Sequence, residues 1–269
     1  MTGQPVGSSG QRRGFGVAAG LDPVVATPLA TRCEELGYSS IWSNDTPLAD
    51  GLETAAAFAE GSAELEIGVT MAIDRHPPAE INAKLDQLGL ERGRLWLAIG
   101  AGVSAKPLTT MREALPQLRE GIPGARLLLA AMGPRMCALA GARYDGAFFN
   151  WMVPDFAARA REQVHAGARE AGREPPPVFG YVRTAVGDDA AKRLAKEEAF
   201  YRNLHQGYSS HFERLGEPHG TVGVAAADHA EAGAELRRYE ALDVLVVRAL
   251  ASGTIEGLGA VAEAAAPAQ

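Results

Sequence analysis

Acidic residues and glycines stand directly after several short apolar segments of this chain. Asp45 follows residues 40–44, Gly100 and Gly102 end another segment, and Gly133-Pro134 comes after residues 126–131. A carboxylate in such a place either binds a ligand or caps the turn and the helix that follow. The glycines suit a ligand whose phosphate meets free backbone N–H groups, above all at Gly133-Pro134, where a helix begins with the positive end of its dipole.

The segment over residues 64–102 shows which elements position these groups. Residues 65–73 form a short, β-branched apolar run typical of a buried strand, and Ile81, Leu85 and Leu88 recur at helical spacing. A second apolar run then leads into the glycines at 100 and 102. Two buried strands joined through a helix indicate a parallel βαβ unit, whose ligands bind at the carboxyl ends of the strands.

The same alternation continues along the chain. Apolar segments predict the other strands over residues 15–19, 40–44, 126–131, 145–150, 178–185 and 243–249. Apolar spacing predicts helices over residues 25–36, 53–59, 108–119, 156–172, 188–205 and 228–239, and one that opens at Gly133-Pro134. Residues 208–222 show less regularity. Eight strands and eight helices predict an α/β protein, a (β/α)8 TIM barrel in a single domain over residues 13–269, after a flexible N-terminal tail of residues 1–12.

Composition narrows the function classes. The 269 residues suffice for one such barrel, and the formal charge of −7 without a basic run argues against nucleic acid or anionic membrane as a partner. The sequence shows no signal peptide and no membrane-length apolar segment, so we expect a cytoplasmic protein. The histidines lack the spacing of metal ligands, which argues against a metal site. Cys33 and Cys137 fall in predicted helices, as buried free thiols do.

In a barrel the active site is built from the carboxyl ends of the strands, so position selects the candidates. They are Ser43, Asn44, Asp45, Thr70, Met71, Gly100, Ala101, Gly102, Met132, Gly133, Arg135, Asn150, Trp151, Arg183, Thr184 and Arg248. His76 lies in a loop after Arg75 and before two prolines, where a structural role is at least as plausible as catalysis. Asp86 and Arg94 are expected to form an ion pair with a structural role and no part in the chemistry.

Several segments resemble a known family. They are GYSSIWSND (37–45), IGVTMAI (67–73), RHP (75–77), LDQL (85–88), GRLWLAIGAG (93–102), AAMGPRM (130–136), LAG (139–141), DGAFFNW (145–151) and AGR (171–173). In their order along residues 15–250 they are similar to the bacterial luciferase-like monooxygenase superfamily. More narrowly, they resemble its branch that uses the deazaflavin coenzyme F420.

The resemblance implies a cofactor ring in the barrel mouth with its phosphate on strand-end backbone. The cofactor-binding residues would be Thr70, Met71, Gly100, Ala101, Gly102, Ala131, Met132 and Gly133. The family also implies a cis peptide at Thr70-Met71 that forms a bulge behind the ring. Such a bond costs about 3–4 kcal/mol and survives only where its surroundings force it.

The catalytic residues that the resemblance implies are Asp45 and the next position. There, relatives often carry a histidine that exchanges a proton, whereas this chain has Thr46. Threonine is no general acid near neutral pH, so the usual proton transfer is in question. The segment from Gly102 to Arg126 is also shorter than in many relatives, which implies a more open pocket or one completed by a partner subunit.

The expected function is an oxidoreductase that transfers a hydride between coenzyme F420 and a small organic substrate, with a homodimer expected by analogy. Two alternatives stay open. One is an FMN-dependent luciferase-like monooxygenase, which would consume oxygen. The other is a barrel that binds a flavin or deazaflavin without turnover, which Thr46 and the short segment favour.

Overall fold

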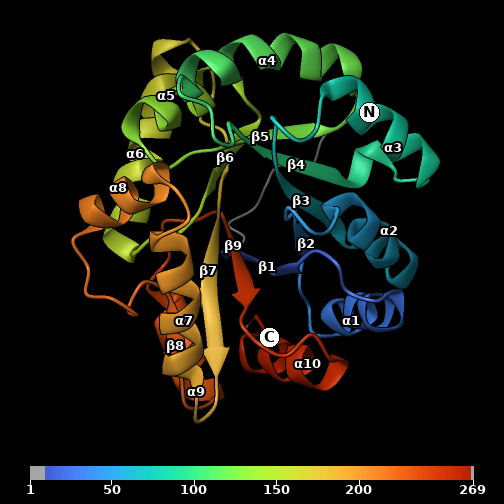
Figure 1. The fold of residues 1–269 in the computed structure, drawn as a ribbon, viewed down its shortest axis with the longest axis vertical. Helices are drawn as coiled ribbons and strands as arrows, with labels where there is room; N and C mark the ends of the chain where they lie inside the picture. The colour runs from blue at the N-terminus through green and yellow to red at the C-terminus, as the bar shows by residue number, and fades with distance from the viewer. Residues whose placement is uncertain (1–9, 268–269) are drawn as a thin grey trace.

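Parallel strands and helices alternate along the chain in the computed structural model, which describes residues 10–267 (Figure 1). The strands are β1 (Arg12–Ala18), β2 (Ser40–Asn44), β3 (Glu66–Ala72), β4 (Leu95–Gly100), β5 (Arg126–Ala130), β6 (Gly146–Phe149), β7 (Val178–Val186), β8 (Val224–Ala226) and β9 (Val244–Ala249). The helices are α1 (Pro23–Glu35), α2 (Gly51–Gly61), α3 (Pro78–Gln87), α4 (Pro107–Gly121), α5 (Pro134–Arg143), α6 (Pro154–Glu170), α7 (Ala190–Arg202), α8 (Gln206–Leu215), α9 (His229–Arg237) and α10 (Ile255–Ala264), with a short 3-10 helix at Arg92–Arg94.

Eight of the strands close into a ring. β1 to β7 follow one another in sequence order, and β9 pairs with both β7 and β1, every pairing being parallel. β8 pairs only with the last residues of β7 and lies outside the ring. The predicted (β/α)8 barrel is therefore confirmed, and its eighth strand is β9.

Two helices were not expected. α8 begins at Gln206 and runs into the less regular stretch of residues 208–222. Only His211 and Phe212 of this helix are buried, so the helix leaves little periodic signal. α10 is built from the alanine-rich end of the chain, where alanine and glycine give no contrast between an apolar and a polar face. Between β4 and β5 the structure has α4 as its one α-helix, in agreement with the predicted short segment.

The barrel interior is filled by large side chains that alternate along the strands. Trp42, Phe148 and Phe179 meet there, with the Trp42 ring centroid 4.8 Å from that of Phe148 and 5.7 Å from that of Phe179. Gly68 of β3 makes room for Trp42, since a Cβ at this position would lie 2.0 Å from the indole. A glycine on one strand thus allows a tryptophan on its neighbour.

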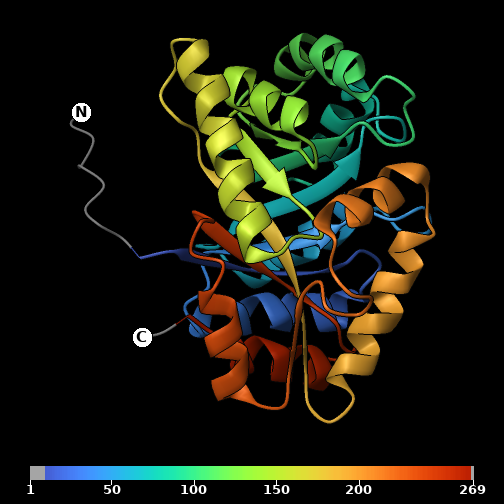
Figure 2. The same ribbon diagram turned by 90° about the vertical axis from the view of Figure 1, so that its left-hand side faces the viewer.

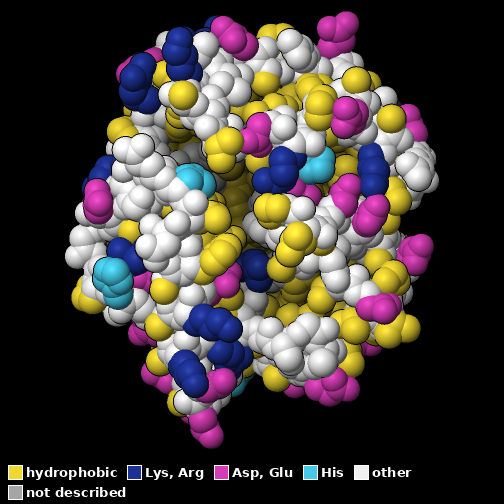
Figure 3. All heavy atoms as spheres, viewed as in Figure 1, with side chains coloured by type: hydrophobic (Ala, Val, Ile, Leu, Met, Phe, Trp, Pro, Cys, Tyr) yellow, Lys and Arg dark blue, Asp and Glu magenta, His cyan; other side chains and the backbone are white. Residues whose placement is uncertain are grey.

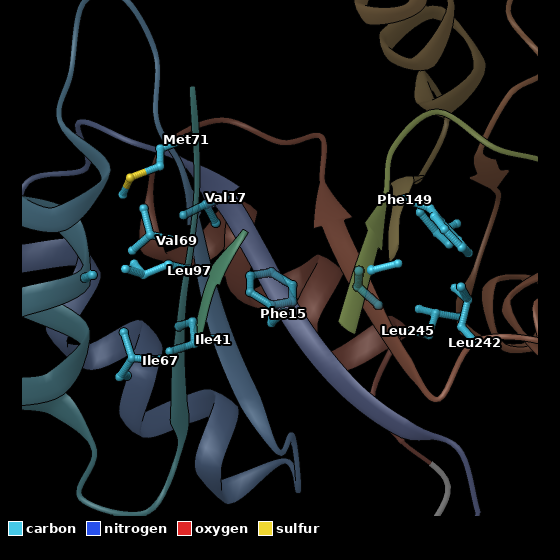
Figure 4. Packing of buried hydrophobic residues seen from close by; sticks show 14 of the residues in the cluster. Phe15, Val17, Ile41, Ile67, Val69, Met71, Leu97, Phe149, Leu242 and Leu245 are labelled. Atoms are coloured by element: carbon cyan, nitrogen blue, oxygen red, sulfur yellow. The ribbon is translucent and has the colours of Figure 1, made fainter. Parts of the chain in front are cut away.

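The opposite faces of the strands pack against the helices. Phe15 and Val17 of β1, Ile41 of β2, and Ile67 and Val69 of β3 belong to this outer layer (Figure 4). Cys33 and Cys137 are also buried there, within α1 and α5, and burial raises the pKa of both thiols. This confirms that they are buried free thiols.

The first two helices after β7 lie on the same side of the barrel. α7 and α8 are drawn in orange in Figures 1 and 2, after the long strand β7. The predicted N-terminal tail lies largely outside the described residues, and β1 already begins at Arg12. In residues 10–267, no helix has the length and hydropathy to span a bilayer, and no three His, Cys, Asp or Glu side chains group as a metal site.

Candidate active site

The carboxyl ends of the barrel strands surround a hollow. Along β1, β4 and β5 the inward-facing positions at this end are Ala18, Gly100 and Ala130, which are small and half-buried. On β7 and β9, which are neighbours in the ring, the inward positions carry Arg183 and Arg248. Figure 3 shows a hollow near the middle of one face, with apolar surface inside it and Lys or Arg and His side chains along its edge. The mouth therefore combines open space beside small residues with the positive charge of two arginines.

Asp45 is the centre of a charged cluster on the rim. Its carboxylate Oδ2 lies 2.5 Å from Arg75 Nη2 and 3.0 Å from His76 Nε2. Its Oδ1 accepts a hydrogen bond from the Gly51 N–H at 3.0 Å. Only 2% of the Asp45 side chain is exposed, against 18% for His76. The loop after β3 thus places an imidazole and a guanidinium against the carboxylate of Asp45, which follows β2.

These contacts shift two pKa values in opposite directions. Burial acts to raise the pKa of Asp45, but hydrogen bonds from His76, Arg75 and Gly51 outweigh it and hold the pKa below the ordinary 3.8. The hydrogen bond to Asp45 raises the pKa of His76 above the ordinary 6.5, against a smaller lowering by burial. His76 therefore keeps its proton to higher pH than a free imidazole does.

The surrounding backbone explains why Asp45 is held so firmly. Its own N–H donates to the Thr70 carbonyl of β3 at 2.9 Å, which extends the pairing of β2 and β3 by one residue. Asp50, and not Asp45, is the N-cap of α2, because the Asp50 side chain accepts from the Leu52 N–H at 2.7 Å. Asp45 is thus free to direct its second oxygen to Arg75 and His76.

Thr46 shapes the loop next to this cluster. Its N–H and carbonyl exchange backbone hydrogen bonds with Ala49, and its hydroxyl accepts from the Leu48 N–H at 3.3 Å. The hydroxyl therefore closes a tight turn directly after Asp45. Its place in a catalytic step stays a prediction.

The expected cis peptide in the third strand is not present. Every peptide bond over residues 10–267 is trans, and Thr70 and Met71 continue the regular pairing with Ala98 and Ile99 of β4. Because successive side chains of a strand point to opposite faces, only one of the two reaches the mouth. Thr70 donates to Asn44 Oδ1 at 2.9 Å, whereas Met71 packs with Val69 in the outer layer (Figure 4). The predicted bulge is wrong for this structure, because the β3 and β4 ladder runs through it unbroken.

The glycines after β4 form a tight rim. Gly102 has φ +60°, a left-handed conformation, and a Cβ there would lie 2.1 Å from the Asp74 carboxylate. Asp74 in turn accepts from the Val103 N–H at 3.1 Å. Ala101 is buried and Gly100 half-buried. These three residues stand at the carboxyl end of β4, and their role in cofactor binding stays a prediction.

The segment after β5 leads into a helix N-terminus. Ala131 is buried and donates its N–H to the Phe148 carbonyl at 3.0 Å, Met132 is half-buried, and Gly133 is the N-cap of α5 with Pro134 behind it. In residues 10–267 no side chain caps this helix. The first N–H groups of an α-helix have no intrahelical acceptor, so this end suits an anion.

Two features of the mouth were not among the predicted catalytic and cofactor-binding residues. The first is the partnership of Arg75 and His76 with Asp45, for which the only sequence signal is a loop that directly follows a strand end. The second is Arg183, whose Nη1 donates to Asn150 Oδ1 and whose guanidinium lies 4.1 Å from the Trp151 ring centroid. Arg183, Asn150 and Trp151 are strand-end candidates by position, but no sequence pattern groups them.

Trp151 has an unusual backbone at the end of β6. In the described part of the chain it is the only non-glycine residue with positive φ, at 49°. Its carbonyl accepts a hydrogen bond from His211 Nε2 of α8 at 2.5 Å, and its ring packs on Tyr201 and Phe212. Burial lowers the pKa of His211, so the imidazole is a neutral structural donor. α8 therefore fixes the shape of this side of the mouth.

Comparisons with known proteins agree with the barrel. The sequence is 26% identical, in a match of length 211, to a 5,10-methylenetetrahydromethanopterin reductase of Methanolobus tindarius, and the match covers 64% of this chain and 64% of that protein. Among solved structures, an F420-dependent secondary alcohol dehydrogenase in complex with an F420-acetone adduct superposes with a TM-score of 0.75 at 17% identity, covering 96% of this chain and 99% of the other.

A coenzyme F420 dependent tetrahydromethanopterin reductase from Methanopyrus kandleri gives a TM-score of 0.72 at 14% identity, covering 95% of this chain and 98% of the other. At such identities the two structures establish the fold. The sequence of residues 107–264, more than half of the chain, matches the model of a family described as luciferase-like monooxygenase. Together with the closed barrel and its strand-end site, this match shows that the chain belongs to the luciferase-like monooxygenase family.

Proposed function

We propose that this protein is an oxidoreductase that transfers a hydride between coenzyme F420 and a small organic substrate. The names of the two solved structures support the cofactor, since both proteins are described as F420-dependent. The single observation that carries the proposal is the Asp45 and His76 pair on the mouth of the barrel. Adding a hydride to a carbonyl or imine also requires a proton, and this pair holds one there.

The mouth fits a flat ring that carries an anionic tail. Ala18, Gly100 and Ala130 leave space inside the rim, and a Cβ at Gly133 would meet no atom within 4 Å. Thr70, Gly100, Ala101 and Gly102 would hold the ring, and the residues 131–133 would hold the phosphate at the N-terminus of α5. When bound, F420 supplies or accepts the hydride.

The protein's own residues manage the proton. His76 Nε2 faces Asp45, which leaves Nδ1 as the ring nitrogen turned away from the carboxylate. In reduction, the imidazolium gives its proton to the substrate heteroatom, and in oxidation the neutral ring accepts it. Asp45 orients the ring and stabilises its charged form, while the turn at Thr46 positions Asp45. His76 thus takes the role that histidine fills in relatives at the position of Thr46.

A cofactor titration tests this function. We expect the purified protein to quench F420 fluorescence with a saturable, micromolar or tighter Kd. The Gly133→Val variant, whose Cβ and methyl groups enter the open space at the α5 N-terminus, should bind at least ~10-fold more weakly. A matched control is Gly93→Val, just before β4 and thus at the opposite end of the barrel from the mouth, where a Cβ would also meet no atom within 4 Å. Saturable binding of FMN without any binding of F420 would contradict the cofactor assignment.

The FMN-dependent monooxygenase is the alternative that the family name favours. It is distinguished by oxygen uptake in the presence of reduced FMN. We expect no uptake above the rate of free reduced flavin. Uptake coupled to substrate oxygenation would replace the present proposal.

The pH dependence of stability tests the His76 pair without a substrate. Because the folded-state pKa of His76 is raised above 6.5, the folded protein binds more protons than the unfolded chain between 6.5 and the raised value. The stabilisation is complete below about pH 6.5 and is lost as the pH rises through the folded-state pKa. The His76→Gln variant should lack this loss, so the difference in Tm between the two proteins narrows toward high pH.

The measurement is thermal unfolding from about pH 5.5 to 9, where imidazole titrates. His219→Gln, at an exposed position, is the control and should follow the wild type. Parallel curves for wild type and His76→Gln would show that the ion pair contributes no proton-linked stability.

We also propose that the protein works as a homodimer. Leu48 and Val103, in the loops after β2 and β4, are 98% and 77% exposed and give the rim apolar surface that a partner subunit would cover. Sedimentation equilibrium should then report twice the chain mass at micromolar concentration, whereas a monomer at all concentrations would contradict this. The cytoplasmic location expected from the sequence stays a prediction.

A further inference from the structure

Two arginines lie side by side in the barrel interior at the carboxyl ends of β7 and β9. Arg183 and Arg248 are register partners in the parallel ladder, so their side chains leave neighbouring strands on the same inward face. They are 1% and 6% exposed. Two like charges are thus held together away from water, an arrangement that costs free energy unless an opposite charge joins them.

No carboxylate compensates this pair. Over residues 10–267, no ion pair within 4.0 Å includes either arginine, and Glu197 acts on Arg248 only from a greater distance. Arg183 donates one hydrogen bond to the neutral side chain of Asn150, and Arg248 donates one to the Ala249 carbonyl at 2.8 Å. Both positive charges therefore remain without a counter-ion in the described chain.

The unpaired polar atoms around the arginines are hydrogen-bond donors. Arg183 Nε and Nη2, Arg248 Nε, Trp151 Nε1 and the Tyr181 hydroxyl are buried and have no partner among the described residues. Tyr181 precedes Arg183 by two positions on the same face of β7, and Trp151 stacks on the Arg183 guanidinium. An acceptor-rich, negatively charged group would satisfy what these donors lack.

Packing holds Arg183 in place for such a group. Its guanidinium lies 4.1 Å from the Trp151 ring centroid and 5.0 Å from that of Tyr201 of α7. Asn150, which accepts from it, donates to the Tyr208 hydroxyl of α8 at 3.1 Å. The fixed guanidinium is thus preorganised, and binding an anion needs little further ordering.

The position of the pair in the ring suggests which molecule supplies the anion. β7 lies four strands from β3, so the arginines face His76, which follows β3, across the mouth. The helix N-terminus that suits the cofactor phosphate follows β5, two strands away from β7. A molecule with an anionic end on the arginines would point its other end toward the proton of His76.

We infer that Arg183 and Arg248 form an anion subsite for the substrate. This substrate is a small organic molecule that gains or loses the hydride and also carries a carboxylate or phosphate group. The identification of the ligand as a substrate rests on the proposed function, whereas the anion subsite itself follows from the two arginines. The charged end is bound by paired guanidinium groups, and the reacting carbon lies toward the opposite rim.

The experiment measures anion binding by the protein without cofactor. Thermal unfolding is followed in sodium phosphate and in sodium acetate, each against sodium chloride of equal ionic strength. We expect one of the two anions to raise Tm by about 5 °C at a concentration near 100 times its Kd. The Arg248→Met variant should lose this response, and it should unfold at a Tm equal to or above that of the wild type in chloride, because an uncompensated buried charge is gone.

Two further variants make the result specific. Arg112→Met removes an exposed arginine of α4 and should keep the full response. Arg248→Lys keeps the charge without the fork of donors and should bind the anion at least ~10-fold more weakly than the wild type. An unchanged response in both Arg248 variants, or no response to either anion in the wild type, would overturn the subsite.

Repeating the titration with saturating F420 separates the two possible sources of the anion. If the response persists, the subsite is available to a substrate beside the cofactor. If F420 abolishes it competitively, the arginines bind the cofactor's own anionic group and the substrate assignment fails. A failure of F420 to bind at all would instead contradict the proposed function, while the response to free anions would still report on the subsite.

Discussion

Asp45→Asn is expected to lower turnover by about a hundredfold or more and to move the pKa of His76 back toward 6.5. Asparagine keeps an oxygen that accepts from the Gly51 N–H, so the loop after β2 retains its shape. It removes the negative charge that holds His76 and Arg75. The imidazole then loses the partner that stabilises its charged form, and proton transfer slows.

Two measurements check this variant. The absorbance of F420 gives the turnover rate with any ketone or imine that the wild type reduces, and NMR titration of the imidazole gives the pKa of His76. Asp86→Asn is the matched control, since Asp86 pairs with Arg92 at 2.7 Å near the end of α3, away from the mouth, and the same charge is removed. A lowered His76 pKa with unchanged turnover would exclude the pair from the reaction. Tight cofactor binding with no hydride exchange in the wild type would favour a binding protein without turnover.

Gly68→Ala is expected to destabilise the fold by about 3 kcal/mol or more, at the upper end of overpacking effects. The new Cβ would lie 2.0, 2.1 and 2.4 Å from three atoms of the Trp42 ring. Trp42 has no exposed surface and is held by Phe148, Phe179 and a hydrogen bond from its Nε1 to Ser40 Oγ at 2.9 Å. The ring has no space to retreat, so strain spreads through the barrel interior.

Chemical denaturation of purified protein measures the change. Gly93→Ala is the control, because a Cβ there would meet no atom within 4 Å, and its stability should change by no more than about 0.5 kcal/mol. Combining Gly68→Ala with Trp42→Phe should recover part of the loss, since the smaller ring frees volume next to the new methyl group. Equal stability of Gly68→Ala and Gly93→Ala would mean that the barrel interior accommodates the methyl group.

The barrel itself could be predicted from local sequence patterns. Each buried strand is a short apolar run and each covering helix an amphipathic repeat, so elements such as β2, at Ser40–Asn44, were predicted with the observed bounds. α8 and α10 were missed because neither shows that repeat. α8 has few buried side chains, and α10 is rich in alanine and glycine. The expected bulge at Thr70-Met71 came from resemblance, and the ladder between β3 and β4 does not contain it.

The sequence by itself determined which residues stand at strand ends, and therefore that Asp45, Thr70, Gly102 and Gly133 border one mouth, because parallel strands all end on the same side. Only the tertiary structure decided which of them meet. His76 contacts Asp45 across 31 positions of sequence, and Arg183 lies beside Arg248 across 65, through pairings of strands that leave no local pattern. Contacts of this kind depend on ring closure and side-chain direction, and these arise only when the whole chain has folded.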